Sequence, residues 1–145
     1  MATELLRRDF SVNAPIDEAW RLLADVSTWP EWAPHIRRLD VSPPGEIGPT
    51  SSGTLHFRPA GRSQFRVSAY AAGTSWEWIG PVLGLSIRYD HRFTSNGART
   101  QLTWTVAEDG DRSARGRLFA SFYGRLVDRA IPRLQARLES PPEGG

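Results

Sequence analysis

FSVNAPIDEAWRLLADVSTWPEWAPHI, residues 10–36, holds the signals on which the fold prediction rests. The residues that lead into this stretch alternate between apolar and polar, so 4–13 is predicted to be a half-buried strand. Pro15 suits the first turn of a helix, where its missing N–H costs nothing, and the residues after it form an amphipathic stripe. Thr28 and Glu31 stand in capping-box spacing and predict a second, short helix.

From residue 35 onward the sequence predicts a run of strands followed by one long helix. Short turns such as Asn96-Gly97 separate the runs and make neighbouring strands antiparallel. The expected strands are 35–41, 54–59, 63–71, 74–80, 86–95 and 99–107. Apolar residues at a spacing of four predict a helix over 113–140, with an inner face of Leu118, Phe122, Leu126, Ala130, Leu134 and Leu138.

Length and composition limit the classes of function that this chain can have. The chain has 145 residues, which suits a single domain, expected over 1–139 with a disordered tail at 140–145. Its 18 basic residues, all Arg, nearly balance 16 acidic ones, and a net charge of +2 does not suggest a nucleic-acid binder. Without Cys, disulfides and thiol nucleophiles are excluded. We expect a cytoplasmic protein, because no apolar run could span a membrane and charges occupy the N-terminal segment.

The aromatic content is high, with six Trp, six Phe and three Tyr. Because side chains alternate faces along a strand, Tyr89 and His91 are predicted to point inward and Arg88 and Arg92 outward. The other inward positions expected from this parity are Leu55, Phe57, Phe65, Val67, Ala69, Trp76, Trp78, Leu85, Ile87, Phe93, Leu102, Trp104 and Val106. Rings in such number either fill a solid core or line a ligand-sized cavity, and the residues alone leave that choice open.

Several segments resemble the START-like (SRPBCC) superfamily, in its polyketide cyclase/dehydrase-like branch. The resemblance lies in Ala14-Pro15, Glu18, Trp20, Asp25 and the turn Trp29-Pro30-Glu31-Trp32-Ala33-Pro34, and in the Trp-containing strand, apolar loop and His-Arg-Phe strand of 74–105. It implies an α+β helix-grip fold, in which a curved antiparallel sheet of about seven strands wraps around a long C-terminal helix, with two short helices after the first strand. It also implies a cavity between sheet and helix that takes an apolar small molecule.

The first functional hypothesis is binding of a hydrophobic, aromatic or polycyclic small molecule. Stacking on Trp side chains would provide affinity, and Tyr89 and His91 would fix the orientation of the ligand. Loops 42–53 and 80–85 are expected to frame the entrance. The predicted ligand-binding residues are Trp32, Leu55, Phe57, Phe65, Val67, Trp76, Trp78, Leu85, Ile87, Tyr89, His91, Phe93, Trp104, Leu118, Phe122 and Leu126.

Two alternatives stay open. The first is a polyketide aromatase/cyclase that promotes aldol ring closure and dehydration, with Tyr89 and His91 as the catalytic pair. The resemblance implies an inward Arg for such enzymes, which Arg88 and Arg92 do not provide. The second alternative is a protein-interaction domain without a metabolite. No cofactor is expected, and no metal, because the three His are predicted on different faces. The expected partner is a small hydrophobic ligand. Neither nucleic acid nor integral association with a membrane is expected, and the protein is expected to be a monomer or homodimer.

Overall fold

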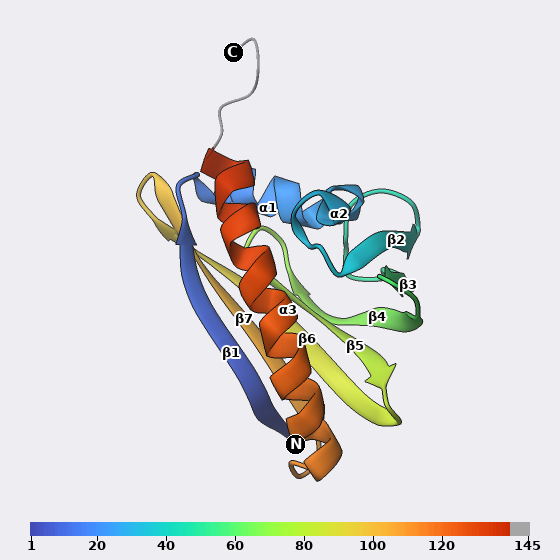
Figure 1. Cartoon of the computed structure of the whole chain (residues 1–145). Coiled ribbons are helices and arrows are strands. Elements are labelled where there is room, and N and C mark those ends of the chain that lie inside the picture. The colour runs from blue at the N-terminus through green and yellow to red at the C-terminus, as the bar shows by residue number, and fades with distance from the viewer. Residues whose placement is uncertain (140–145) are drawn as a thin grey trace.

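The fold is a seven-stranded antiparallel sheet that curves around a long helix (Figure 1). This computed structural model describes residues 1–139. The strand order is β1-β7-β6-β5-β4-β3-β2, so the first strand pairs with the last and the remainder form a meander. The elements are β1 (Ala2–Val12), α1 (Ile16–Ala24), the 3-10 turn η1 (Val26–Thr28), α2 (Trp29–Trp32), β2 (Ile36–Ser42), β3 (Ser52–Phe57), β4 (Arg62–Ala71), β5 (Ser75–Val82), β6 (Leu85–Asn96), β7 (Arg99–Asp109) and α3 (Ala114–Glu139).

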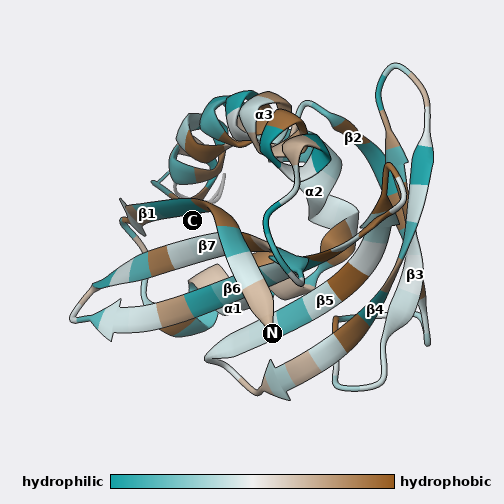
Figure 2. Ribbon diagram, turned by 90° about the horizontal axis from the view of Figure 1, so that it is seen from below, coloured by the Kyte–Doolittle hydropathy of each residue, from teal (hydrophilic) through white to brown (hydrophobic). Residues whose placement is uncertain are grey.

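The predicted α+β helix-grip fold is confirmed, including the two short helices after the first strand. Figure 2 looks from below and shows the sheet curving beneath α3, with apolar segments on β4 and β5. The strand expected at 54–59 begins earlier, at Ser52, and ends at Phe57. The tail expected at 140–145 lies outside the described residues.

A layer of packed aromatic rings forms the centre of the core. The side chains of Trp76, Trp78 and Phe93 are 0%, 2% and 2% exposed. Trp20 of α1 packs edge-on against Trp76, with ring centroids 5.3 Å apart, and against Phe93 at 5.1 Å. Edge-to-face pairs of this kind add to the free energy of burying the rings, so Trp20 helps to hold α1 against β5 and β6.

A bulge in β4 corrects one expectation about strand parity. Val67 pairs with Trp78, but Ala69 pairs with Glu77, so Ser68 is an extra residue in the ladder. Beyond the bulge the alternation is reversed, because one added residue moves every later side chain to the other face. Ala69, expected to point inward, is exposed, whereas Tyr70 packs against Trp20 at 5.9 Å.

The inner face of α3 also differs from the prediction. Leu118 and Phe122 are 67% and 62% exposed, so the expectation that they point inward is wrong. The helix instead directs a different set of side chains toward the sheet: Phe119, Tyr123, Val127, Ala130 and Leu134. The physical reason is the helical period of 3.6 residues, because a spacing of four drifts by about 40° at each step. A series that starts on the outside at Leu118 therefore reaches the inside only near Ala130.

Candidate functional site

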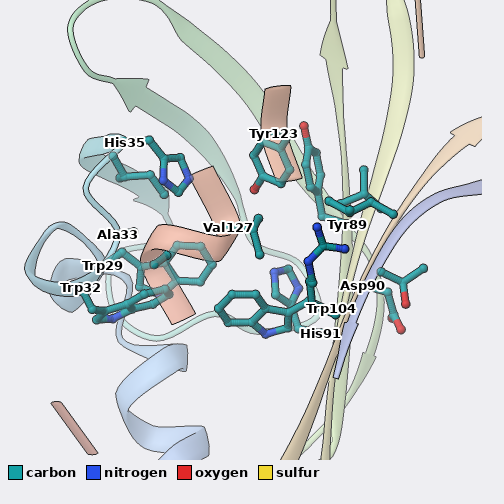
Figure 3. A pocket seen from close by; sticks show the side chains of 16 residues that line it. Trp29, Trp32, Ala33, His35, Tyr89, Asp90, His91, Trp104, Tyr123 and Val127 are labelled. Carbon is teal, nitrogen blue, oxygen red and sulfur yellow. The ribbon is translucent and has the colours of Figure 1, made fainter. Parts of the chain in front are cut away.

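A small, largely apolar cavity lies between the sheet and α3, and we call it the inner chamber. Its volume is about 40 Å³. Figure 3 shows Tyr89 and Tyr123 together at one end and Trp29, Trp32 and Trp104 toward the other. The walls come from β1, α2, the start of β2, β6, β7 and α3, and none of the lining residues belongs to β3, β4 or β5.

A second hollow, the outer groove, opens beside the chamber and has a volume of about 410 Å³. It is bounded by the β3–β4 turn over 58–61, by the β5–β6 turn around Leu83, and by Phe119, Phe122 and Leu126 of α3. Its size falls in the range of small-molecule pockets. The expectation that 42–53 frames the entrance is wrong, because Ile47 hydrogen-bonds through its N–H to the carbonyl of Ala24, on the α1 side.

The inner chamber and the outer groove share three lining residues: His35, Tyr89 and Tyr123. We call these three side chains the constriction. The rings of Tyr89 and Tyr123 lie 5.6 Å apart and meet edge to face, and His35 meets Tyr123 in the same manner at 5.8 Å. These rings therefore form a wall that is common to the groove and the chamber.

His91 lies at the floor of the chamber as a neutral imidazole. It stacks on Trp76 with centroids 4.6 Å apart, and its Nδ1 lies 3.3 Å from the Trp76 carbonyl oxygen, to which it donates. Burial lowers the pKa of His91 to about 4, because the charged form would lose its hydration. With Nδ1 as the donor, Nε2 is left as a hydrogen-bond acceptor on the ring.

The two tyrosines of the constriction are held in the protonated form. Burial raises the pKa of Tyr89 well above its usual value, and the neighbouring Tyr123 raises it further. Burial also raises the pKa of Tyr123. Within residues 1–139 neither hydroxyl makes a hydrogen bond to a protein atom, so both O–H groups can donate to a ligand.

His35 is also buried and neutral, because burial lowers its pKa to about 4. Its Nδ1 has no hydrogen-bond partner within the described residues. A buried polar atom without a partner is unfavourable in the free protein, because its desolvation is not compensated. His35 therefore adds a second imidazole that can bind a polar group of a ligand at the constriction.

Arg8 is a partly exposed cation beside the inner chamber that the sequence analysis overlooked. It lies on the wall of the inner chamber, and its Nε donates to Asp128 Oδ1 on α3 at 2.7 Å. The Arg8 guanidinium lowers the pKa of the Asp128 carboxyl by hydrogen bonding and charge. The signal was present in the sequence, because Arg8 falls on the same side of β1 as Leu6 and Phe10.

The structure distributes the predicted ligand-binding residues over several environments. Trp32, Tyr89, His91 and Trp104 line the inner chamber. Phe57, Phe122 and Leu126 line the outer groove, where Tyr89 also appears. Phe65 and Leu85 lie beside a shallower depression over β4 and β5. The remaining residues pack in or against the core, apart from Leu118 on the surface: Leu55, Val67, Trp76, Trp78, Ile87 and Phe93.

Chemically, the site offers hydrogen bonds and apolar contact. It has two neutral hydroxyl donors at Tyr89 and Tyr123 and two neutral imidazoles at His35 and His91. No group of three or more His, Cys, Asp or Glu within residues 1–139 is arranged to hold a metal ion. None of the helices described is long and apolar enough to cross a membrane.

Comparison with known proteins agrees with this architecture. Residues 5–139 match the family model described as polyketide cyclase / dehydrase and lipid transport. Comparison with the curated proteins found no match.

Solved structures share the fold at low sequence identity. The Zhui aromatase/cyclase from Streptomyces sp. R1128 is 17% identical with a TM-score of 0.76, over 100% of this chain and 99% of that one. A START superfamily protein from Mycobacterium smegmatis is 15% identical with a TM-score of 0.73, over 94% and 98%. A protein from Thermobifida fusca is 18% identical with a TM-score of 0.74, over 97% and 98%.

Proposed function

Because the chain belongs to the polyketide cyclase/dehydrase and lipid transport family, we propose that it binds an apolar, aromatic or polycyclic small molecule between its sheet and its long helix. The observation that carries the proposal is the connection between the two spaces. A large apolar groove and a small aromatic chamber share His35, Tyr89 and Tyr123 as a common wall, and the buried Nδ1 of His35 has no hydrogen-bond partner within residues 1–139.

The volumes favour the groove over the chamber as the place for such a ligand. A chamber of about 40 Å³ holds little more than water. The groove of about 410 Å³ accommodates the body of a fused-ring molecule. The body of the ligand therefore packs on Phe119 and Leu126, and its inner end contacts the constriction. A carbonyl at that end accepts hydrogen bonds from the tyrosine hydroxyls, and a hydroxyl donates to an imidazole.

The test is a titration with a defined panel: anthraquinone, 2-naphthol, oleic acid and cholesterol. Binding is followed by isothermal calorimetry and by the shifts of backbone amide resonances, because the groove contains no Trp to report on it. We expect saturable binding of at least one aromatic compound, with shifts at groove residues. No binding by any member of the panel would overturn the proposal.

Leu126→Gln is the variant that locates the ligand, since Leu126 is half-buried on the groove wall. We expect about a tenfold loss of affinity from the apolar contact removed. Arg129→Gln is the matched control, because Arg129 is exposed on the same helix and does not line the groove. Equal affinities of the two variants would place the ligand elsewhere and contradict the groove site.

A cyclase is the second candidate, and one observation favours it. Arg8 places a cation on the wall of the chamber, whereas Arg88 and Arg92 do not line it and pair with carboxylates elsewhere. Aldol closure also needs a base, and the buried imidazole of His91, with a pKa of about 4, is a weak one. A linear poly-β-ketone thioester tests this function. Unchanged turnover in the Tyr89→Phe and His91→Gln variants would contradict a catalytic role for this pair.

A further inference from the structure

Exposed apolar side chains gather at the mouth of the outer groove. Apart from Met1, the large apolar side chains that are strongly exposed in residues 1–139 are Leu83 at 59%, Leu118 at 67% and Phe122 at 62%. Leu83 and Phe122 line the groove, and Leu118 lies one helical turn before Phe122. We call these three residues the apolar rim. In Figure 1 the β5–β6 hairpin and the first turns of α3 lie at the same lower end of the molecule.

The hairpin and the helix are joined at this rim. Arg115, in the first turn of α3, donates from Nη1 to the carbonyl oxygen of Leu83 at 2.8 Å. Leu118 lies three residues further along the same side of the helix. Thus the tip of the hairpin and the helix present their apolar side chains around one opening.

Leu83 adopts a backbone conformation that is unfavourable for a leucine. Its φ is +52°, in the left-handed region, and Gly84 follows with a φ of +78°. Two-residue hairpin turns with both φ angles positive favour Asn-Gly, because the Cβ of a branched residue is crowded there. Leu83 is also 59% exposed, so much of its side chain does not pack against the protein. Residues held in sparsely populated backbone conformations cluster at functional sites such as ligand-binding surfaces.

The charge around the rim is positive. Arg58 and Arg62 line the groove, and its lining contains no Asp or Glu. Arg129 continues the face of α3 that carries Phe122. Of the acidic residues near the start of α3, Glu108 is buried and accepts from the Ser113 N–H, and Asp109 pairs with Arg88. Asp111 is exposed there but does not line the groove. The open face at the mouth is therefore apolar at its centre and cationic at its border.

From this arrangement we propose that the mouth of the groove docks onto a bilayer of anionic phospholipids. Leu83, Leu118 and Phe122 enter the interfacial region, and the surrounding guanidinium groups bind lipid phosphates. A second copy of the chain fits this face less well, because a symmetric dimer would oppose two borders of arginines. Docking turns the groove toward the lipid, so that an apolar ligand passes between the bilayer and the groove; this last step rests on the proposed function.

The experiment is sedimentation of the whole protein with vesicles of phosphatidylcholine alone, or of phosphatidylcholine with about one third phosphatidylglycerol. No apolar ligand is added, so the result is independent of whether the groove binds anything. We expect binding to the anionic vesicles, weaker binding to the neutral ones, and a decrease at high salt. Equal binding to both compositions, or binding to neither, would overturn the proposal.

Leu83→Asn is the decisive variant because it does not threaten the fold. It produces an Asn-Gly turn, which suits positive φ, so its thermal stability should equal or exceed that of the wild type. Combined with Phe122→Ser, it should weaken vesicle binding by at least about tenfold. Arg62→Gln should also weaken it. Arg99→Gln, on the exposed β6–β7 turn at the other end of the sheet, is the matched control and should bind normally.

Two results would contradict the assignment of this face. The first is unchanged vesicle binding in the Leu83→Asn, Phe122→Ser double variant. The second is a concentration-dependent dimer that disappears in that same double variant, which would make a second copy the occupant. Groove titrations on the wild-type protein are read separately, so a failure to bind anthraquinone leaves the vesicle result interpretable.

Discussion

The guanidinium of Arg8 on β1 extends past Gly124 to the carboxylate of Asp128 on α3. Its Nε lies 2.7 Å from Oδ1 and its Nη2 lies 3.2 Å from Oδ2. A Cβ at Gly124 would lie 3.2 Å from that Nη2 and 3.4 Å from the Leu6 side chain, so the absence of a side chain there makes the close approach possible. Because Arg8 also lines the inner chamber, this ion pair fixes the helix to the edge strand at the chamber wall.

Asp128→Asn should therefore lower the free energy of unfolding by less than about 1 kcal/mol, because both side chains are partly exposed and solvent screens the pair. Arg8 lowers the pKa of Asp128 in the folded state, so the stabilisation is present above the unfolded pKa and is lost as pH falls through the folded pKa. Urea unfolding at pH 7 and in acid checks this. Asp111→Asn, on an exposed turn, is the control; a difference that persists in strong acid would contradict the charge explanation.

The buried histidines predict a fall in stability as the pH decreases. His35 and His91 both have a folded pKa of about 4, below the unfolded value of about 6.5. The unfolded chain therefore binds more protons between these values, and stability is lost as pH falls from about 6.5 to about 4. Each histidine accounts for up to about 3 kcal/mol over that interval.

Urea unfolding of the wild type and of His91→Phe across this pH interval measures the effect. The variant keeps a ring on Trp76 and should have a shallower dependence, by about one proton. His35→Phe should give a similar reduction, and the double variant should have little dependence left from these sites. Parallel curves for wild type and His91→Phe would show that His91 is not buried in the neutral form.

The sequence predicted the fold well because the main signals are local. Pro15, the alternating strands and the Asn96-Gly97 turn each specify their own element, and short turns leave an antiparallel meander as the arrangement. Errors arose where one element changes the geometry of a neighbour. The bulge at Ser68 reversed the parity of β4, and nothing in the residues around it marks the extra position.

The candidate site was less predictable because it depends on which face of α3 meets the sheet. A spacing of four suggested Leu118 and Phe122, whereas the contact is made by Phe119 and Tyr123. Tyr123 was therefore missed, although Tyr89, its partner across the constriction, followed correctly from strand parity. The ion pair of Arg8 joins residues 120 apart in sequence, which periodicity cannot connect.

Gly53 is predicted to be intolerant of any side chain. A Cβ there would lie 1.9 Å from the carbonyl oxygen of Asp40 on the paired strand β2, and 3.0 Å from the ring of Phe65. The backbone cannot move aside as a flexible side chain does. Gly53→Ala should therefore lower the free energy of unfolding by more than about 2 kcal/mol and separate β2 from β3. Gly48→Ala is the matched control, since its nearest neighbour would be 4.0 Å away. Thermal unfolding compares the two, and equal melting temperatures would contradict this packing.

Removing the hydroxyl of Tyr89 or Tyr123 should separate ligand binding from folding. Neither hydroxyl hydrogen-bonds to a protein atom within residues 1–139, so Tyr89→Phe and Tyr123→Phe should leave the free energy of unfolding unchanged or raise it by up to about 1 kcal/mol. Under the proposed function the same variants should bind anthraquinone about fivefold to tenfold more weakly, because its carbonyl loses a donor.

Anthracene, which has the same three fused rings without carbonyl groups, provides the matched ligand control and should bind the wild type and both variants equally. Calorimetric titration gives the affinities, and urea unfolding gives the stabilities. A parallel loss for anthracene would show that the substitutions disturb the shape of the constriction. A loss of more than about 1 kcal/mol in stability would show that the hydroxyl has a partner in the folded protein. Either result would contradict the role assigned to the tyrosine pair.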